Sequence, residues 1–136
     1  TQQQAERTGA RVTFHHDPLP ARLDPLLETT CFRITQEALT NIVRHARARA
    51  VQIELRLADT TLHLFVRDDG IGFDVAGVRQ GPQRGASLGL LGMEERASLV
   101  GGGIEIISVP QQGTEVHGWF PTTTAAPPGA GPGRNV

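Results

Sequence analysis

Five segments of this chain alternate apolar and polar residues, and two longer segments with helical spacing lie between them. Alternation predicts strands with one buried face, and apolar residues three and four positions apart predict amphipathic helices. Strands are expected at 11–16, 51–57, 62–66, 104–109 and 114–120, and helices at 24–47 and 87–100. This order predicts an α+β fold, a two-layer α/β sandwich with helices on one face of a mixed, mostly antiparallel sheet.

The composition is that of one domain without a strong charge bias. With 136 residues, the chain is long enough for one substantial hydrophobic core. Its formal net charge is −1 and its pI is about 6.5, which excludes the basic surface typical of nucleic-acid binding. No apolar run approaches the roughly 18–20 residues that span a bilayer, so no membrane segment is expected.

Cysteine and histidine usage favours a reducing compartment and no zinc site. Cys31 is the only cysteine, which excludes an internal disulfide and predicts a cytoplasmic domain, whether or not its parent protein is membrane-anchored. Its place among apolar helix positions predicts a buried, unreactive thiol. The five histidines are too scattered along the chain to predict a zinc site.

Three segments are expected along the chain. Residues 1–9 fit the end of a preceding helix or a linker, and the abrupt start suggests a piece of a longer protein. Residues 10–121 form the domain. Residues 122–136 are rich in Thr, Ala, Pro and Gly and have little to bury, so this tail is expected to be disordered.

The first helix has one face of convergent polar side chains. Glu37, Asn41, Arg44 and His45 fall within an arc of roughly 100° at 3.6 residues per turn. A solvated surface helix is the ordinary explanation of such a face. Asn41 argues against it, because asparagine is unfavourable in mid-helix. The opposite, apolar face is expected to comprise Phe32, Ala38, Leu39, Ile42, Val43 and Ala46.

A second polar cluster follows the third expected strand, in the run Asp68-Asp69-Gly70-Ile71-Gly72. A carboxylate at a strand end accepts hydrogen bonds and cannot donate, so Asp68 suits the exocyclic amine of adenine and repels the carbonyl of guanine. Gly70 and Gly72 are expected to turn the backbone with positive φ. An ordinary acidic turn is the alternative, because Asp-Gly is a common turn dipeptide.

Other features fit a phosphate-bearing ligand. Asn41 offers an amide oxygen suited to Mg²⁺, and Glu37 can hold a water or polarise a nucleophile. Arg44 can meet a phosphate and His45 can add a hydrogen bond, although a structural role for His45 is equally consistent. Gly89 and Gly92, expected at the start of the second helix, would leave amide donors free for phosphates. No P-loop, dinucleotide fingerprint or eukaryotic-type kinase signature occurs.

In order, the chain carries Glu-x-x-x-Asn on a helix, Asp-x-Gly-x-Gly, Gly-Leu-Leu-Gly-Met-x-Glu-Arg-Ala and Gly-Thr-x-Val. Over about residues 10–121 it resembles the catalytic ATP-binding domain of bacterial two-component sensor histidine kinases. It is most similar to the subfamily whose response regulators carry a helix-turn-helix domain. The resemblance implies the Bergerat fold, shared with gyrase, mismatch-repair and heat-shock chaperone ATPases.

The same resemblance implies roles for individual residues. Asn41 would be the Mg²⁺ ligand, Glu37 the polar neighbour of the γ-phosphate and Asp68 the adenine reader. Residues from about 74 to 88 would form a short, mobile ATP lid. The residues assigned to ATP binding are Asn41, Arg44, His45, Asp68, Gly70, Gly72, Gly89, Leu90, Gly92 and Thr114, with Glu37 and Asn41 catalytic.

The expected function is ATP·Mg²⁺ binding and transfer of the γ-phosphoryl group to a histidine on a separate dimerisation domain of the parent protein. The response regulator would be an indirect partner. An ATPase or an anti-sigma-type serine kinase of the same fold is the alternative. The chain departs from the family in two ways: Asp69 stands where many relatives have asparagine, and no phosphoacceptor helix with its histidine is present.

Overall fold

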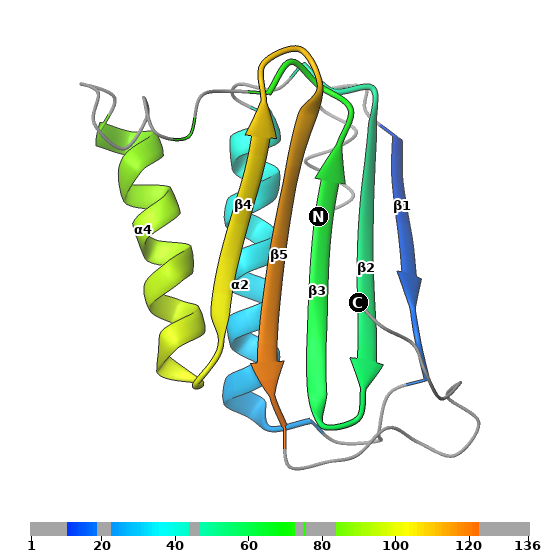
Figure 1. The fold of residues 1–136 in the computed structure, drawn as a ribbon, viewed down its shortest axis with the longest axis vertical. Coiled ribbons are helices and arrows are strands. Elements are labelled where there is room, and N and C mark those ends of the chain that lie inside the picture. The colour runs from blue at the N-terminus through cyan, green and yellow to red at the C-terminus, as the bar shows by residue number, and fades with distance from the viewer. Residues whose placement is uncertain (1–10, 19–22, 44–46, 73–74, 76–83, 123–136) are drawn as a thin grey trace.

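The computed structural model describes residues 11–18, 23–43, 47–72, 75 and 84–122. Its described part consists of a five-stranded sheet and two helices, as expected for the α+β sandwich (Figure 1). The elements in chain order are β1 (Arg11–His16), α2 (Pro25–Asn41), β2 (Ala50–Ala58), β3 (Thr61–Asp68), α4 (Arg84–Leu99), β4 (Gly103–Val109) and β5 (Gly113–Pro121). The expected segment 1–9 lies outside the described residues, as does the expected tail 122–136 apart from Thr122, whose amide donates to the Thr60 carbonyl at 2.7 Å.

The sheet is mixed and mostly antiparallel, which confirms the prediction. Its strand order is β1-β2-β3-β5-β4, with β1 parallel to β2 and all other neighbours antiparallel. The pairing places Asp68 of β3 opposite Thr114 of β5. It also places Thr114 opposite Ser108 of β4. One end of the sheet therefore carries a row of polar residues across three strands.

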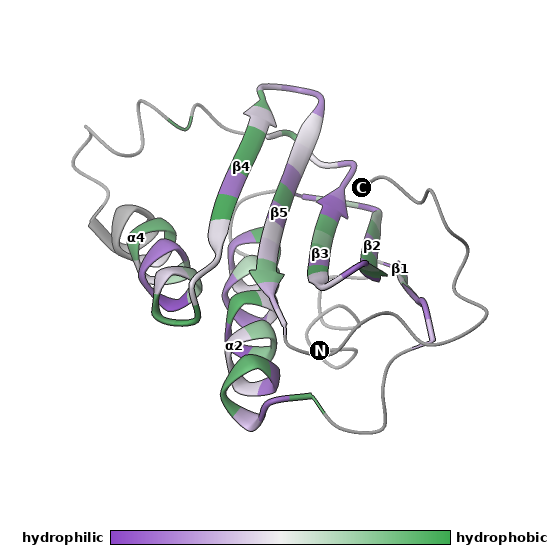
Figure 2. Cartoon of the chain, turned by 60° about the horizontal axis from the view of Figure 1, so that its bottom comes forward, coloured by the Kyte–Doolittle hydropathy of each residue, from purple (hydrophilic) through white to green (hydrophobic). Residues whose placement is uncertain are grey.

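The core lies between the two helices and one face of the sheet. The strands contribute alternate residues to it, and apolar and polar bands alternate along them accordingly (Figure 2). Both helices contribute residues that are almost fully buried, so both cover the same face. The most deeply buried side chains are Phe120, Ile34, Leu39, Leu57, Leu62, Leu64, Leu90, Met93, Val51 and Val66.

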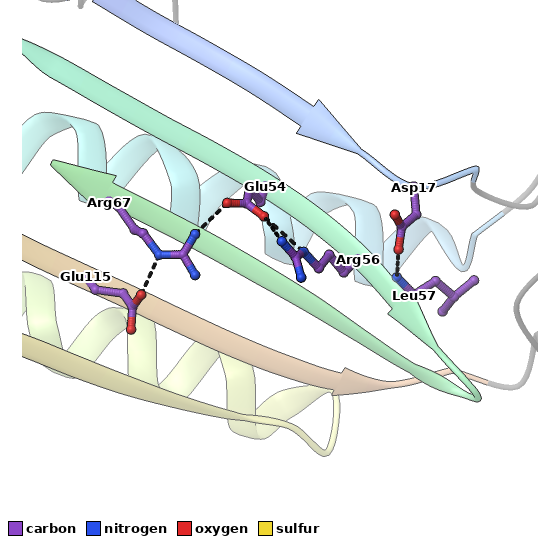
Figure 3. Close-up of polar contacts among 6 residues, drawn as sticks. All are labelled: Asp17, Glu54, Arg56, Leu57, Arg67 and Glu115. Carbon is purple, nitrogen blue, oxygen red and sulfur yellow. Dashed lines mark hydrogen bonds and ion pairs between the residues drawn. The ribbon is translucent and has the colours of Figure 1, made fainter. Parts of the chain in front are cut away.

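The opposite face of the sheet carries paired charges. Arg67 of β3 lies between Glu54 of β2 and Glu115 of β5, with ion-pair distances of 2.5 Å to each (Figure 3). Glu54 also pairs with Arg56 at 2.7 Å. Such cross-strand pairs hold the register of the three central strands. In the described part of the chain, no helix is long and apolar enough to cross a membrane.

Helix α2 begins as the sequence predicts and ends earlier. Asp24 caps it by accepting a hydrogen bond from the Leu26 amide at 2.8 Å, and Pro25 takes the first helical position. The α-helical part ends at Asn41, Ile42 and Val43 continue it as a π-helical turn, and Arg47 has a φ of 48°. The prediction of a helix to Arg47 was therefore wrong at its end, because Arg47 turns the chain toward β2 in a left-handed conformation.

Two residues expected on the apolar face of α2 are exposed instead. Phe32 is 54% and Val43 is 38% exposed, whereas Ala38, Leu39 and Ile42 are buried. Phe32 points toward the β1 side of the sheet, where it borders an apolar hollow of about 350 Å³ with Phe14 and Cys31. Cys31 is partly rather than fully buried, and this burial raises the pKa of its thiol to about 12, as expected for an unreactive thiol.

Candidate functional site

Asp68 is the last residue of β3, and its carboxylate lies on the side of the sheet that faces the helices. Its Oδ1 accepts a hydrogen bond from the Gly70 amide at 2.8 Å. Burial raises the pKa of this carboxyl above its usual value, and the neighbouring charge of Asp69 adds to the rise. The backbone amides of Gly70 and Thr114 act in the opposite direction. Asp68 is thus a half-buried acceptor that has no ion pair with a described residue, which suits a neutral amine donor.

Only one of the two motif glycines turns with positive φ. Gly72 has a φ of 65°, and a Cβ there would lie 2.2 Å from the Val109 carbonyl oxygen. This close approach, together with a hydrogen bond from the Gln111 amide to the Ile71 carbonyl, ties the motif to the β4–β5 turn. Gly70 does not have positive φ. The expectation for Gly70 was wrong because the Asp68 side chain makes that turn by accepting from its amide.

Asp69 has a structural role that the sequence did not suggest. Its exposed carboxylate accepts hydrogen bonds from the amides of Arg49 at 2.8 Å and Ala50 at 3.0 Å. These bonds lower the pKa of Asp69. They join the end of β3 to the segment that leads from α2 into β2. The Asp69 carboxylate therefore fixes the backbone before β2 and does not present an unpaired charge to the candidate site.

Helices α2 and α4 meet at the other side of the candidate site. Glu37 is half-buried on α2, and its carboxylate lies against Gly89 of α4, where a Cβ would be 2.3 Å from Glu37 Oε1. Asn41, one turn further along, is also half-buried. The structure thus brings together Glu37 and Gly89, which belong to two different motifs of the sequence. Arg44 and His45 lie outside the described residues.

Substituting Gly89 tests this contact. Gly89→Ala is expected to leave stability unchanged or slightly higher, because alanine favours helix by about 0.5–1 kcal/mol. The added methyl would force the Glu37 carboxylate to rotate away, so we expect phosphoryl transfer to slow several-fold. Thermal unfolding and transfer rates measure the two effects. In a Glu37→Ala background, Gly89→Ala should not slow transfer further. An equal slowing there would show that Gly89→Ala does not act through the Glu37 carboxylate.

Helix α4 begins at Arg84, three residues before the expected start. Gly89 and Gly92 therefore lie inside the helix, where their amides have intrahelical partners. The expectation that these amides face phosphates from the first turn was wrong for that reason. Leu90 is 2% exposed, so its side chain belongs to the core and only its backbone is available to a nucleotide. Of the expected lid, only Val75 and the helical backbone of 84–88 are described.

Ser108 was not predicted from the sequence as part of the site. Its Oγ lies 2.7 Å from Thr114 Oγ1, in the polar row that also contains Asp68. Ser108 follows Ile104 and Ile106 on the helix-facing side of β4, and both isoleucines pack against the core. Residues two apart on a strand face the same side, so Ile104 and Ile106 place Ser108 on the side that faces the helices. With the register of the β4–β5 hairpin, this spacing could have predicted Ser108 beside Thr114.

The described side chains of the site are consistent with a Mg²⁺ ion that is coordinated mostly by ATP phosphates and water. Among the described residues, no group of three or more His, Cys, Asp or Glu side chains is arranged to hold a metal. A Mg²⁺ ion bound with ATP takes most of its ligands from phosphates and water and needs few from protein. The amide oxygen of Asn41 on the half-buried face of α2 is consistent with that role.

A mixed sheet with two helices on one face, a half-buried acid at a strand end and a half-buried glutamate and asparagine on a helix are the features that the ATPase-type motifs predict. Residues 27–124 match the family of histidine kinase-, DNA gyrase B- and HSP90-like ATPases. The chain belongs to this family. Within it, the chain is a catalytic ATP-binding domain of the sensor histidine kinase type, as the following relatives indicate.

Two relatives and one solved structure are informative. A sensor-like histidine kinase of Chloroflexus aurantiacus is 43% identical over 101 residues, covering 74% of this chain and 17% of that protein. The oxygen sensor histidine kinase NreB of Staphylococcus carnosus is 36% identical over 115 residues, covering 85% and 32%. The structure of full-length ShkA in complex with AMPPNP superposes with a TM-score of 0.76 at 25% identity, covering 93% and 28%.

The relatives decide between the two functional classes left open by the motifs. The chain spans less than a third of the length of either relative and of ShkA. The two relatives are named as histidine kinases, and ShkA is a structural neighbour that matches nearly the whole chain. The serine kinase or ATPase alternative is therefore not favoured. The predicted kinship with the subfamily whose regulators carry a helix-turn-helix domain stays a prediction.

Proposed function

We propose that this domain binds ATP with Mg²⁺ and donates the γ-phosphoryl group to a histidine on another domain of its parent protein. Adenine would lie against the end of the sheet, with its amine donating to Asp68. The phosphates would extend toward Glu37 and Asn41. The observation that carries the proposal is the half-buried, acceptor-only carboxylate of Asp68 at the end of β3, in a chain that matches the histidine kinase-like ATPase family.

The transfer itself requires positioning and charge neutralisation. An imidazole nitrogen of the acceptor histidine would attack the γ-phosphorus as the bond to the bridging oxygen breaks, leaving ADP. Glu37 would polarise the imidazole by accepting its N–H proton or a hydrogen bond from it. Asn41 would hold Mg²⁺, which neutralises the phosphate charge when bound.

The partners and location follow from this chemistry. The direct partner is the dimerisation and phosphoacceptor domain of the parent kinase, and a response regulator would receive the phosphoryl group from that domain. We place the domain in the cytoplasm, where ATP is supplied and where the free thiol of Cys31 stays reduced.

Phosphoryl transfer to an added acceptor tests the function. The domain is mixed with γ-labelled ATP, Mg²⁺ and the acceptor-helix domain of the same parent protein. We expect slow, acid-labile labelling of the acceptor, because separate domains lack the effective concentration that covalent linkage supplies. The domain alone should stay unlabelled. Acid-stable label on a serine, or acid-labile label on the domain alone, would contradict the proposal.

A further inference from the structure

The open face of the sheet, opposite the helices, carries two histidines in contact across strands. His63 of β3 and His117 of β5 are 54 positions apart in the chain. They are diagonal neighbours in the sheet, because the register pairs His63 with Trp119 and Phe65 with His117. His63 Nδ1 lies 2.9 Å from His117 Nε2, the distance of a hydrogen bond between one protonated and one bare ring nitrogen. Each ring therefore presents a nitrogen to the other.

Aromatic packing holds these two rings in place. The His117 ring stacks on Phe65 at a centroid distance of 4.4 Å and an angle of 6°, and Trp119 lies 5.3 Å from it. The His63 and His117 rings are within 17° of parallel. Phe65 is only 6% exposed although it lies on the open face, because His117 and the Arg67 guanidinium cover it. The paired imidazoles are thus part of one packed cluster on the sheet.

Both imidazoles are neutral near pH 7, which is the form that binds metals. Burial lowers the pKa of each ring, and the charge of His117 lowers the pKa of His63 further. The carboxylates of Glu115 and Glu105 raise the pKa of His117 in part, whereas Arg67 lowers it. The proton of the hydrogen bond can move through water to the outer nitrogen of its own ring. Both facing nitrogens then bind a metal ion without loss of a proton.

The separation of the two nitrogens selects the kind of metal. Imidazole nitrogens bind divalent metals at roughly 2.0–2.1 Å, so a spacing of 2.9 Å corresponds to an N–metal–N angle of about 90°. That angle suits the square or octahedral coordination of Ni²⁺ and is smaller than the roughly 109° of tetrahedral Zn²⁺. The ion would lie beside the line that joins the nitrogens, and each ring would turn its lone pair toward it. Among the described residues no group of three or more such side chains is arranged to hold a metal, so water would fill the other positions.

We propose that His63 and His117 form a binding site for Ni²⁺, which links β3 to β5 on the open face of the sheet. Glu105 lies directly opposite His117 on β4, is exposed and makes no ion pair in the described part of the chain. Its carboxylate would accept a hydrogen bond from a metal-bound water, as outer partners at metal sites do. The nucleotide site lies on the other face of the sheet, so this metal site does not depend on the proposed function.

Nickel titration of the chain, without an affinity tag and without nucleotide, tests this site. By calorimetry we expect one Ni²⁺ per chain. His63→Gln and His117→Gln should each weaken binding at least about tenfold, since the loss of even an outer partner costs roughly 10- to 100-fold. His15→Gln is the matched control, because His15 lies on the same face, opposite Glu54 of β2, and should leave the affinity unchanged.

A second measurement needs no variant to fold. Ni²⁺ with water in its other positions is paramagnetic, so it should broaden the imidazole NMR signals of His63 and His117 before those of the other histidines. Ni²⁺ should also raise the thermal midpoint of the wild type and not that of His63→Gln. No binding by the wild type, equal affinities in all variants, or a loss for only one of His63→Gln and His117→Gln would overturn the shared site.

Discussion

Glu37→Gln is expected to slow phosphoryl transfer to the acceptor histidine about 10²- to 10⁴-fold, the usual contribution of a positioned acid or base. Glutamine has nearly the same shape, so the close packing of this side chain against Gly89 is retained. Only the ability to accept a proton is lost. ATP affinity should change little, because the carboxylate acts on the nucleophile and not on the bound nucleotide.

Single-turnover transfer with the nucleotide pre-bound measures this effect separately from binding. Thr40→Ala is a suitable control, since Thr40 lies on the same helix and its hydroxyl bonds only to the Gln36 carbonyl in the described structure. A Glu37→Gln domain that transfers at the wild-type rate would remove Glu37 from the mechanism.

The second large effect is expected at the adenine end of the site. Asp68→Asn should weaken ATP binding about 10- to 100-fold, because a hydrogen bond to a charged group contributes roughly 1.5–3 kcal/mol. The amide also offers a donor where the adenine amine needs an acceptor. Stability should not fall, since burial raises the pKa of Asp68 and ionisation at neutral pH therefore opposes folding.

Asp69→Asn is the matched control for that substitution. Asparagine keeps one oxygen that can accept from the amides of Arg49 and Ala50, as the carboxylate does. ATP affinity should therefore stay close to that of the wild type. Calorimetry on both variants decides between the two acids: a large loss for Asp69→Asn with none for Asp68→Asn would reverse their assignment.

The strands of this domain were predictable because one side of the sheet is open. Each strand contributes alternate residues to the core, and the opposite positions carry groups such as Glu54, Arg67 and Glu115. Periodicity of two therefore appears directly in the sequence. The start of α2 was also predictable from the sequence, because Asp24 and Pro25 act within the first turn of the helix.

The errors arise where tertiary contacts override local pattern. Phe32 has the spacing of a core residue, but it faces the β1 side, where Phe14 is also exposed. The true start of α4 lies among glycines and polar residues with no distinct capping signal. The contacts of Asp69 and Ser108 are made with other strands or the segment before β2, so they become visible only once the register is known.

Calorimetry with ATP and GTP, with and without Mg²⁺, tests adenine recognition by this domain most directly. We expect Mg²⁺ to strengthen the binding of ATP, and GTP to bind at least about tenfold more weakly, because Asp68 would accept from the adenine amine and repel the guanine carbonyl. Equal affinities for the two nucleotides, or no binding of either, would contradict it.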